Sequence, residues 1–443
     1  MKSSVSNVPT IFALASAPGR AGVAVLRISG PNARLALTKF CQTSIFAPRI
    51  ATLSKITDAT GTLIDRALVL YFAAPDSFTG EDVVEFHLHG GRAIIKAVIN
   101  ALQSLSNFRL AEPGEFTRRA FENGKMDLTE AEAIADLVDA ETEAQRRQAV
   151  RQMEGELGRL YNQWGEQLKR ILAHFEADID FADEDLPADI ATQHAMNIQK
   201  LLTEVTTHLD DAHRGERLRT GFTVAILGPP NAGKSSLLNA LVQREAAIVS
   251  PTPGTTRDVI EVQLDLGGYP VTLADTAGLR ASMDEIESEG IRRAHHRAEQ
   301  ADLKLLVFDG AAWPVMDEAT CALIDENSIV VMNKIDLLAA VVPPSLIPIS
   351  ATTGAGLKEL TTQLVEAIDL RFANTGQPCL TRARHRAALE ETKQHLQRSL
   401  TASEAALRAE DVRLAMRALG RITGKVDVED LLDVIFREFC IGK

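Results

Sequence analysis

The chain has 443 residues, of which 45% are hydrophobic and 24% charged, and its 47 Lys and Arg against 60 Asp and Glu give a formal net charge of −13. This composition excludes a disordered chain and fits about three globular domains. The acidic balance excludes a general polyanion binder, so any nucleic-acid contact needs a local basic patch. The four cysteines, Cys41, Cys321, Cys379 and Cys440, form no C-x-x-C pair, which argues against a disulfide scaffold or a zinc site. The same cysteine usage fits a reducing cytoplasm, where we expect the protein. No apolar run has the length of a membrane helix, so we expect no membrane partner.

Residues 1 to about 122 alternate short β-type runs with a helical run, which predicts a compact α+β unit. The predicted strands are 22–29, 68–72 and 83–88, and the predicted helix is 93–105. From residue 128 to about 181 the apolar spacing becomes helical, and Thr129 with Glu132 resembles a capping box at the start of this region.

The stretch 222–370 alternates strands and helices, which predicts a doubly wound, mostly parallel α/β sheet. Helical spacing returns from Arg382 to the end, so the α/β domain is expected to interrupt one discontinuous all-α domain. We therefore expect a multidomain chain with an α+β domain at 1–122, helical segments at 123–215 and 373–443, and an inserted P-loop GTPase domain at 216–372.

The segment Gly228-Pro-Pro-Asn-Ala-Gly233-Lys234-Ser235 lies between an apolar strand and a helical run. This is the G-x-x-x-x-G-K-S phosphate-binding loop in the context that it requires. Glycines let the backbone wrap around phosphates, and the amides at the helix start point at them. Lys234 is expected to bind the β- and γ-phosphates, and the Ser235 hydroxyl to bind Mg²⁺.

Three further motifs follow in the order of a GTPase, each at the end of a predicted strand. Asp275-Thr-Ala-Gly278 is suited to hold Mg²⁺ through water and to sense the γ-phosphate. In Asn333-Lys334-Ile335-Asp336 the last carboxylate can accept two hydrogen bonds from guanine that adenine cannot match. Ser350-Ala351 can close over the base, and Thr256 is the natural switch threonine for Mg²⁺. The motifs together predict that the central domain binds and hydrolyses GTP.

Two positions depart from the commonest GTPase pattern. Leu279 stands where Ras-like proteins carry a glutamine that orients the attacking water, so another residue or an ion must do this. The candidates are the acids just downstream, Asp284, Glu285, Glu287 and Glu289. Asn231 lies inside the phosphate-binding loop, where its amide oxygen could help to hold a monovalent cation or could simply shape the loop.

Motifs outside the central domain complete the pattern. They are Ala17-Pro-Gly19-Arg-Ala-Gly22, Ser77-Phe-Thr-Gly-Glu81, His89-Gly-Gly91, Pro113-Gly-Glu115-Phe-Thr-Arg-Arg-Ala-Phe121, Asn123-Gly-Lys125-Met-Asp127 and the terminal Cys440-Ile-Gly-Lys443. With these motifs the whole chain resembles the MnmE (TrmE) family of tRNA modification GTPases.

The resemblance implies an N-terminal domain that binds a tetrahydrofolate derivative, in the 5-formyl or methylene form, and that forms a homodimer. It implies a potassium-activated GTPase that acts with an MnmG-type FAD protein, as a heterotetramer. Their joint product would be an aminomethyl or carboxymethylaminomethyl group at C5 of the wobble uridine of certain tRNAs.

The resemblance also assigns residues. The folate-binding positions are Arg27, Glu85, Lys125 and Lys443; the potassium positions are Asn231, Ser250, Thr252 and Thr255; and the Mg²⁺ positions are Ser235 and Thr256. The catalytic candidates are Glu287 from the resemblance, Lys234 from the phosphate-binding loop, and Cys440. Cys440 could act as a nucleophile or acid near the uridine but is equally explained as a small buried apolar residue. Motifs and resemblance together give the expected GTP contacts as Asn231, Ala232, Gly233, Lys234, Ser235, Ser236, Ser250, Thr255, Thr256, Asp275, Thr276, Ala277, Gly278, Asn333, Lys334, Asp336, Ser350 and Ala351.

The alternative is a ribosome-assembly or RNA-binding switch GTPase, which would not need the terminal Cys440-Ile-Gly-Lys443 or the folate-type motifs. Local charge supports RNA binding weakly under either hypothesis, since residues 381–425 hold ten Lys and Arg against five acids. His87 and His89 share one strand face as metal ligands do, but without a third ligand a structural role is favoured.

Overall fold

The computed structural model describes residues 8–43, 45–180, 189–211, 213–247, 260–275, 296, 298–338, 342–372, 378–426, 428–437 and 439–443. The chain forms two compact units. Unit 1 comprises Met1–Ala135, Met153–Arg170 and Arg413–Lys443, and unit 2 comprises Asp136–Gln152 and Ile171–Val412. Over the described ranges, no helix is long and apolar enough to cross a membrane.

Unit 1 contains a six-stranded sheet in the order β3-β4-β5-β2-β1-β6, antiparallel except for the β1–β6 pair. The strands predicted at 22–29, 68–72 and 83–88 are confirmed as β2 (Ala21–Ser29), the second half of β4 (Leu63–Phe72) and β5 (Val83–Gly90). The remaining strands are β1 (Thr10–Leu14), β3 (Thr52–Thr57) and β6 (Phe108–Leu110).

Helices cover both faces of this sheet. Because side chains alternate along a strand, Phe12 and Leu26 lie in the core with α1 (Ala33–Phe40) and α2 (Arg92–Gln103), the helix predicted at 93–105. Ile11 and Ala13 point the other way and pack against Phe116 of α3 (Glu115–Glu122). The α3 side of the sheet carries the candidate site described below.

Two more helices of unit 1 share a buried core next to α3. They are the first part of α4 (Leu128–Asp139) and α15 (Glu429–Arg437), which bury Leu128, Ala131, Leu432, Ile435 and Phe436 together.

The capping box predicted at Thr129 and Glu132 is wrong by two positions. The Asp127 carboxylate accepts hydrogen bonds from the amides of Thr129 and Glu130, and the Glu130 carboxylate accepts one from the Asp127 amide at 2.8 Å. The helix begins at Leu128, so the residue just before it caps the first turn, and both Thr129 and Glu132 are buried.

Unit 2 contains a seven-stranded sheet in the order β13-β12-β11-β7-β10-β9-β8. The first five are parallel neighbours, and β9 and β8 are antiparallel, which confirms the predicted mostly parallel sheet. The strands are β7 (Phe222–Leu227), β8 (Ala246–Ala247), β9 (Ile260–Leu266), β10 (Tyr269–Asp275), β11 (Leu303–Asp309), β12 (Ser328–Asn333) and β13 (Ile347–Pro348).

Both faces of the unit 2 sheet are buried, as a doubly wound fold requires. Val224 and Ile226 of β7 lie in one core with α9 (Lys234–Arg244) and α12 (Leu357–Phe372). Ala225 and Leu227, on the opposite face, lie in a second core beside α11 (Glu318–Cys321). β7 is therefore held from both sides, which fixes the loop that follows it.

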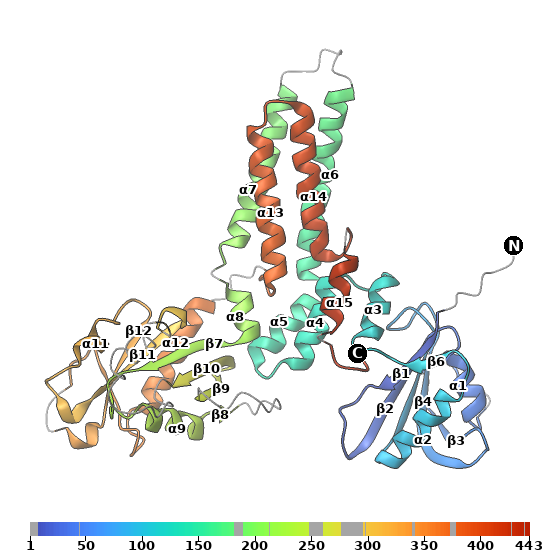
Figure 1. Cartoon of the computed structure of the whole chain (residues 1–443), viewed down its shortest axis with the longest axis horizontal. Coiled ribbons are helices and arrows are strands. Elements are labelled where there is room, and N and C mark those ends of the chain that lie inside the picture. Colours follow the sequence, from blue (N-terminus) through green and yellow to red (C-terminus); the bar gives the residue numbers. More distant parts are fainter. Residues whose placement is uncertain are drawn as a thin grey trace, which may run out of the picture. The chain divides into compact units, whose positions relative to one another are not determined.

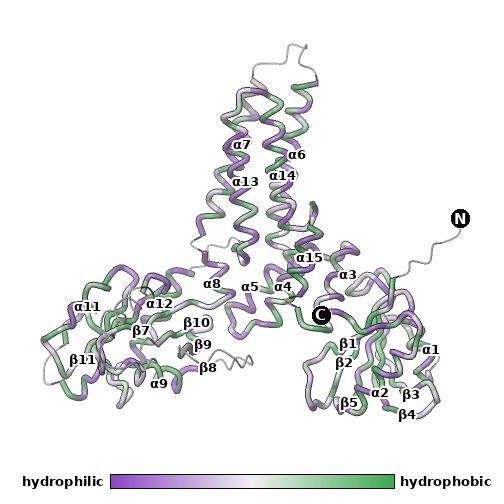
Figure 2. The backbone as a smooth tube through the Cα atoms, in the orientation of Figure 1, coloured by the Kyte–Doolittle hydropathy of each residue, from purple (hydrophilic) through white to green (hydrophobic). Residues whose placement is uncertain are grey.

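Six further helices in the described part of the chain come before and after this sheet in the sequence, in agreement with a discontinuous helical domain. They are α5 (Glu143–Met153), α6 (Glu156–Asp180), α7 (Asp189–Leu209), α8 (Arg214–Thr220), α13 (Ala383–Thr401) and α14 (Ala405–Thr423). α7 and α13 pack side by side (Figure 1). Along α13 the buried positions recur at helical spacing, and the rest of the helix is largely hydrophilic (Figure 2).

Candidate functional site

The nucleotide motifs meet at one edge of the unit 2 sheet. The parallel strands β7, β10 and β12 end at Leu227, Asp275 and Asn333, and Ser350 follows β13. The carboxyl ends of parallel strands share an edge, so the loops that carry the motifs start side by side. This edge, next to the strand where the chain order reverses, is where doubly wound folds bind ligands.

The phosphate-binding loop has a backbone that requires glycine. Gly228 has a φ of +150° and Gly233 a φ of +90°. A Cβ at Gly228 would collide with the Val307 backbone of β11, and one at Gly233 with the Asn333 amide. Asn231 also has a positive φ, at +64°, which asparagine tolerates better than most residues. The loop therefore turns tightly into α9, whose first amides suit a phosphate.

Lys234 is the first residue of α9, and its side chain folds back over the loop. Only 8% of it is exposed, and its Nζ donates hydrogen bonds to the carbonyl oxygens of Gly228 at 2.7 Å and Pro229 at 2.8 Å. The ammonium thus lies at the mouth of the glycine cradle. Ser235 follows at the second position of the helix, where a hydroxyl can face a metal ion.

Asn333 connects three motifs through a single buried side chain. It is 2% exposed; its Nδ2 donates to the Ala232 carbonyl oxygen at 2.8 Å, and its Oδ1 accepts from the Ala351 amide at 3.0 Å. The Ile349 amide in turn donates to the Met332 carbonyl oxygen at 2.8 Å. Asn333 therefore holds the phosphate-binding loop and the Ser350-Ala351 segment in register.

The neighbouring residues leave Asp336 available to a base. Lys334 has a φ of +62°, and its Nζ pairs with the Asp309 carboxylate at 2.7 Å. Asp336 lies in the short turn Ile335–Leu337, and its side chain is exposed. Within the described ranges the Asp336 carboxylate makes no hydrogen bond or ion pair, so its oxygens can accept from guanine.

The remaining expected contacts fall elsewhere. Those that lie outside the described residues are Ser250, Thr252, Thr255, Thr256, Thr276, Ala277, Gly278 and Glu287. Of Asp275 the structure describes the backbone at the end of β10. Among the expected metal positions, Asn231 and Ser235 are described.

A second candidate site lies on the α3 side of the unit 1 sheet. Arg27 of β2 and Glu85 of β5 are direct partners across the two strands, with Nε 2.9 Å from Oε1. The Arg27 guanidinium lies 5.4 Å from the ring centroid of Phe78 and 5.8 Å from that of Phe116. A carboxylate, a guanidinium and two aromatic rings suit a flat heteroaromatic ligand with an amide edge.

The two histidines that resemble metal ligands each pair with a carboxylate. His87 Nε2 lies 3.3 Å from Glu85, and His89 Nδ1 lies 2.8 Å from Asp65. These contacts support the structural role favoured from the sequence. No cluster of three His, Cys, Asp or Glu residues suited to a metal occurs in the described part of the chain.

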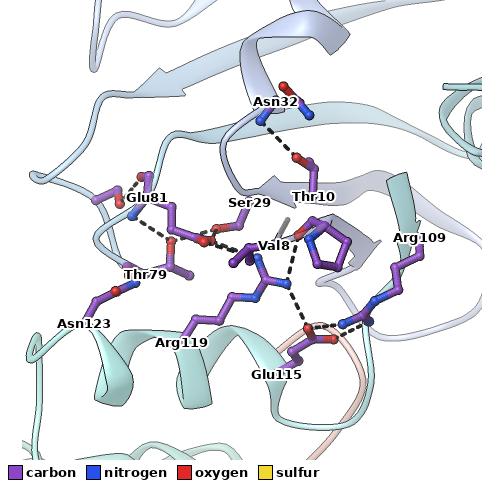
Figure 3. Close-up of polar contacts among 12 residues, drawn as sticks. Val8, Thr10, Ser29, Asn32, Thr79, Glu81, Arg109, Glu115, Arg119 and Asn123 are labelled. Carbon is purple, nitrogen blue, oxygen red and sulfur yellow. Dashed lines mark hydrogen bonds and ion pairs between the residues drawn. The ribbon is translucent and has the colours of Figure 1, made fainter. Parts of the chain in front are cut away.

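A buried charge network supports this second site. Arg119 of α3 is 6% exposed and pairs with Glu81 at 3.1 Å and with Glu115 at 2.9 Å (Figure 3). Arg109 of β6 binds Glu115 from the other side at 2.6 Å. Burial raises the pKa of Glu115, but the bonds from Arg109, the Glu112 amide and Arg119 together hold that pKa below its usual value.

The same network fixes the loop that carries Phe78. The Ser29 hydroxyl lies 2.7 Å from both Thr79 Oγ1 and Glu81 Oε2, and Asn123 Nδ2 donates to the Thr79 carbonyl oxygen at 2.7 Å (Figure 3). The loop is thereby tied to β2 and to the end of α3. Phe78 is held against Arg27 as a result.

Lys125 and the C-terminal tail approach the same side of unit 1. Lys125 Nζ donates to the Pro75 carbonyl oxygen at 2.9 Å, just before the Phe78 loop. In the tail, Ile441 forms an antiparallel β-bridge with Pro113. Gly442, with a φ of +100°, packs against the Leu14 backbone at the end of β1. Leu14 is next to Ala13, the strand partner of Arg27. Unit 1 therefore brings the tail to the strand that neighbours Arg27.

Cys440 is exposed, so the alternative that it is a small buried apolar residue is wrong. Sequence reasoning also missed several residues that shape the two sites. Asp309 and the clamping role of Asn333 were not foreseen, nor were Phe78 and Arg119. The sequence holds no signal that separates Arg119 from its neighbour Arg118, because the carboxylate partners that a buried arginine needs become evident only once its burial is known.

Comparison with known proteins assigns the family. Residues 10–125 match the model of the GTP-binding protein TrmE N-terminus, and residues 128–440 match that of the MnmE helical domain. The chain is also similar to a solved structure, the G domain of the T. maritima FeoB iron transporter, with 30% identity over 33% of this chain and 98% of that chain, at a TM-score of 0.25.

Curated relatives match over nearly the full length. The chain is 56% identical to the tRNA modification GTPase MnmE of Parvibaculum lavamentivorans, over 98% of this chain and 100% of that protein. It is 55% identical to the same-named protein of Paramagnetospirillum magneticum, over 98% and 99%. It is 48% identical to the mitochondrial 5-taurinomethyluridine-[tRNA] synthase subunit GTPB3 of Danio rerio, over 98% and 93%. In sequence order, an α+β domain is followed by a helical domain into which a P-loop GTPase domain is inserted. The chain belongs to the MnmE (TrmE) family of tRNA modification GTPases.

Proposed function

We propose that the chain is a potassium-activated GTPase that acts with an MnmG-type FAD protein on certain tRNAs. The pair would build the aminomethyl or carboxymethylaminomethyl group at C5 of the wobble uridine, with a tetrahydrofolate derivative as the one-carbon donor. The observation that carries the proposal is the combination of a phosphate-binding loop in unit 2 with the Arg27–Glu85 pair and the docked C-terminal tail in unit 1. A ribosome-assembly switch would need the phosphate-binding loop but not the site in unit 1.

The direct test is mass analysis of wobble nucleosides from cells that lack this chain. We expect the C5 substituent to disappear from the modified uridine and to return when the chain is supplied again. An unchanged nucleoside profile would refute the proposal.

We assign the hydrolysis site to Lys234, Ser235 and Thr256, with GTP and Mg²⁺, and assign K⁺ to Asn231 with Ser250, Thr252 and Thr255. Asn231 lies between Gly228 and Gly233 in the phosphate-binding loop, so a cation bound to its amide oxygen would lie beside the phosphates. Positive charge at that point stabilises the transition state, a term worth about 10³–10⁵ in rate where an arginine finger supplies it. We expect faster hydrolysis in KCl than in NaCl at matched ionic strength; equal rates would remove the cation from the mechanism.

Glu287 is proposed to orient the attacking water, because Leu279 cannot. Glu287→Ala should abolish most hydrolysis and leave GTP affinity nearly unchanged, whereas Glu289→Ala, which removes a neighbouring acid, should do neither. Single-turnover rates and nucleotide titrations on both variants decide between them. If Glu287→Ala still hydrolyses GTP near the wild-type rate, another acid orients the attacking water.

Arg27, Glu85, Lys125 and Lys443 are proposed to bind the folate. The carboxylate suits the pterin amide edge, the cations suit the glutamate tail, and the phenyl rings beside Arg27 suit the ring system. Glu85→Gln should weaken binding of 5-formyltetrahydrofolate at least about tenfold, because it removes a charge-assisted bond. Glu154→Gln, at an exposed position of the same unit, is the matched control, and titration calorimetry measures both. Equal affinities would exclude Glu85.

The C-terminal tail is proposed to act in the modification and not in GTP hydrolysis. Deletion of 440–443 should abolish modification and leave GTPase activity largely intact, because the nucleotide motifs lie in unit 2. Cys440→Ser separates a role of the exposed thiol from a role of the tail. Normal wobble-uridine modification by the deletion variant would exclude the tail.

The proposed partners are a second copy of the chain, the MnmG-type FAD protein in a heterotetramer, and tRNA. We place them in the cytoplasm, since all four cysteines are free. The proposed domains are 1–122, 123–215, 216–372 and 373–443; β7 begins at Phe222 and α12 ends at Phe372, which supports the limits of the third. Limited proteolysis with mass analysis tests these limits, and light scattering tests the assembly.

A further inference from the structure

A row of basic residues follows one side of α14 in unit 1. Arg413, Arg417 and Arg421 recur at every fourth residue, and Lys425 follows in the turn that ends the helix. Arg417 and Lys425 are exposed, and the other two are half-buried. No acidic residue occurs from 412 to 426. Because residues four apart lie on the same side of a helix, the three arginines form a row along α14, and Lys425 follows just beyond its end. We call these four residues the basic stripe.

The stripe has the spacing and chemistry of a phosphate-binding surface. Four residues of helix rise about 6 Å, comparable to the separation of neighbouring phosphates along an RNA strand. The three arginines also interact with other residues of the chain, which holds them in place. A guanidinium has five N–H donors, so one that is held in this way can still form a paired contact to a phosphate.

The stripe leads to the candidate folate site. Gly424, with a φ of +85°, packs so closely on Phe121 and Leu128 that a Cβ would lie 2.6 Å and 2.8 Å from them. The end of α14 therefore rests on the end of α3 and the start of α4. Lys125 stands in the turn between these two helices, where its amide donates to the Ala120 carbonyl oxygen at 2.8 Å. Lys425 thus lies next to the turn that carries a proposed folate ligand.

The positive charge stops at this point. The next helix, α15, carries Asp430 and Asp433, and Asp433 is paired with Arg118 at 2.8 Å. An anionic strand that follows the stripe would be repelled along α15 and directed toward Lys125. On a chain with a net charge of −13, such a local positive surface determines where a polyanion can bind.

We propose that the basic stripe binds the phosphate backbone of the tRNA substrate and leads the RNA to the candidate folate site, an inference that rests on the proposed function. The contacts are to phosphates, so they set position and affinity and do not read the base sequence.

The test uses the full chain with Arg417→Gln and Lys425→Gln combined. Lys169→Gln with Arg170→Gln is the matched control, because it removes two exposed charges from α6 of the same unit. Fluorescence anisotropy with labelled tRNA at several KCl concentrations measures affinity and its salt dependence. We expect the stripe variant to bind roughly tenfold or more weakly near 0.1 M salt, with a log K against log[salt] slope shallower by about 1.4–1.8.

GTP hydrolysis should be unchanged in both variants, which checks that they fold, and tRNA binding should be unchanged in the control. A stripe variant with the wild-type affinity and slope would overturn the inference while leaving the proposed function intact. An equal loss in both variants would also overturn it, because net charge would then explain the effect. If the wild-type chain does not bind tRNA, the proposed function fails and the inference falls with it.

Discussion

Arg119→Met should destabilise unit 1 strongly, whereas Arg118→Met, one residue away, should have little effect. Arg119 is buried and bridges Glu81 and Glu115, and its Nη2 also donates to the Pro9 carbonyl oxygen at 3.0 Å. Arg118 is partly exposed and pairs with Glu122 and with one other exposed carboxylate. The two variants remove the same side chain from the same helix and differ in burial.

The magnitude follows from what each substitution leaves behind. Without Arg119, the Glu115 carboxylate is still paired with Arg109. The Glu81 carboxylate, whose side chain is only 17% exposed, is left with neutral hydrogen-bond donors. Removing one partner of a buried ion pair costs about 3–5 kcal/mol, against about 0–1 kcal/mol for an exposed pair. For a unit of this size the larger value lowers Tm by roughly 10 °C.

The assay uses the two tryptophans of the chain, because Trp164 lies in unit 1 and Trp313 in unit 2. In a Trp313→Phe background the fluorescence of the buried Trp164 reports the unfolding of unit 1 in urea. Arg119→Met should shift the midpoint, abolish 5-formyltetrahydrofolate binding and leave GTP binding intact. Equal midpoints for the two arginine variants would refute the role assigned to the buried network.

Three further outcomes are expected. Gly228→Ala should lower GTP affinity roughly tenfold to a hundredfold in nucleotide titrations, because a Cβ there meets the Val307 backbone. Asp336→Asn should weaken GTP binding by about the same factor and improve binding of xanthosine triphosphate, whose base accepts where guanine donates; equal affinities would exclude this carboxylate. Burial lowers the pKa of His208 from 6.5 to about 4, so its neutral form stabilises unit 2 above pH 6.5 by about 3 kcal/mol, which is lost as the pH falls toward 4. Acid unfolding followed through Trp313 should be less steep in His208→Gln.

The nucleotide site could be predicted from the sequence because its backbone constraints select particular residues. A strand that passes close behind Gly228 excludes every side chain there, and the positive φ of Gly233 excludes most. Such constraints leave glycines at fixed offsets, and the flanking strand and helix follow from their apolar periods. The strands at 22–29 and 83–88 were predictable for the same reason, and they begin and end within two residues of the expected limits.

The contacts that support the second site could not be predicted in this way. Arg119 and Glu81 are 38 positions apart. The spacing of residues along one strand or one helix therefore gives no indication that they meet. Arg118 and Arg119 look alike in the sequence, and only the packing of α3 on the sheet decides which is buried. The cap of α4 was misplaced for a related reason, since Asp127 and Thr129 are both good capping residues and the start of the helix selects between them.

The same long-range contacts make the two ends of the chain depend on each other. The Phe78 loop is ordered by α3, and α3 is held by α15, since Gly114 at the start of α3 packs on the Phe436 backbone. Unit 1 therefore needs the C-terminal helix, although all of unit 2 lies between α3 and α15 in the sequence. The entropy of closing so long a connection rises only with the logarithm of its length, by about 0.6 kcal/mol for each doubling. A folded insertion shortens the effective connection further, so a whole GTPase domain can be inserted into the sequence of unit 1 at little cost to the stability of that unit.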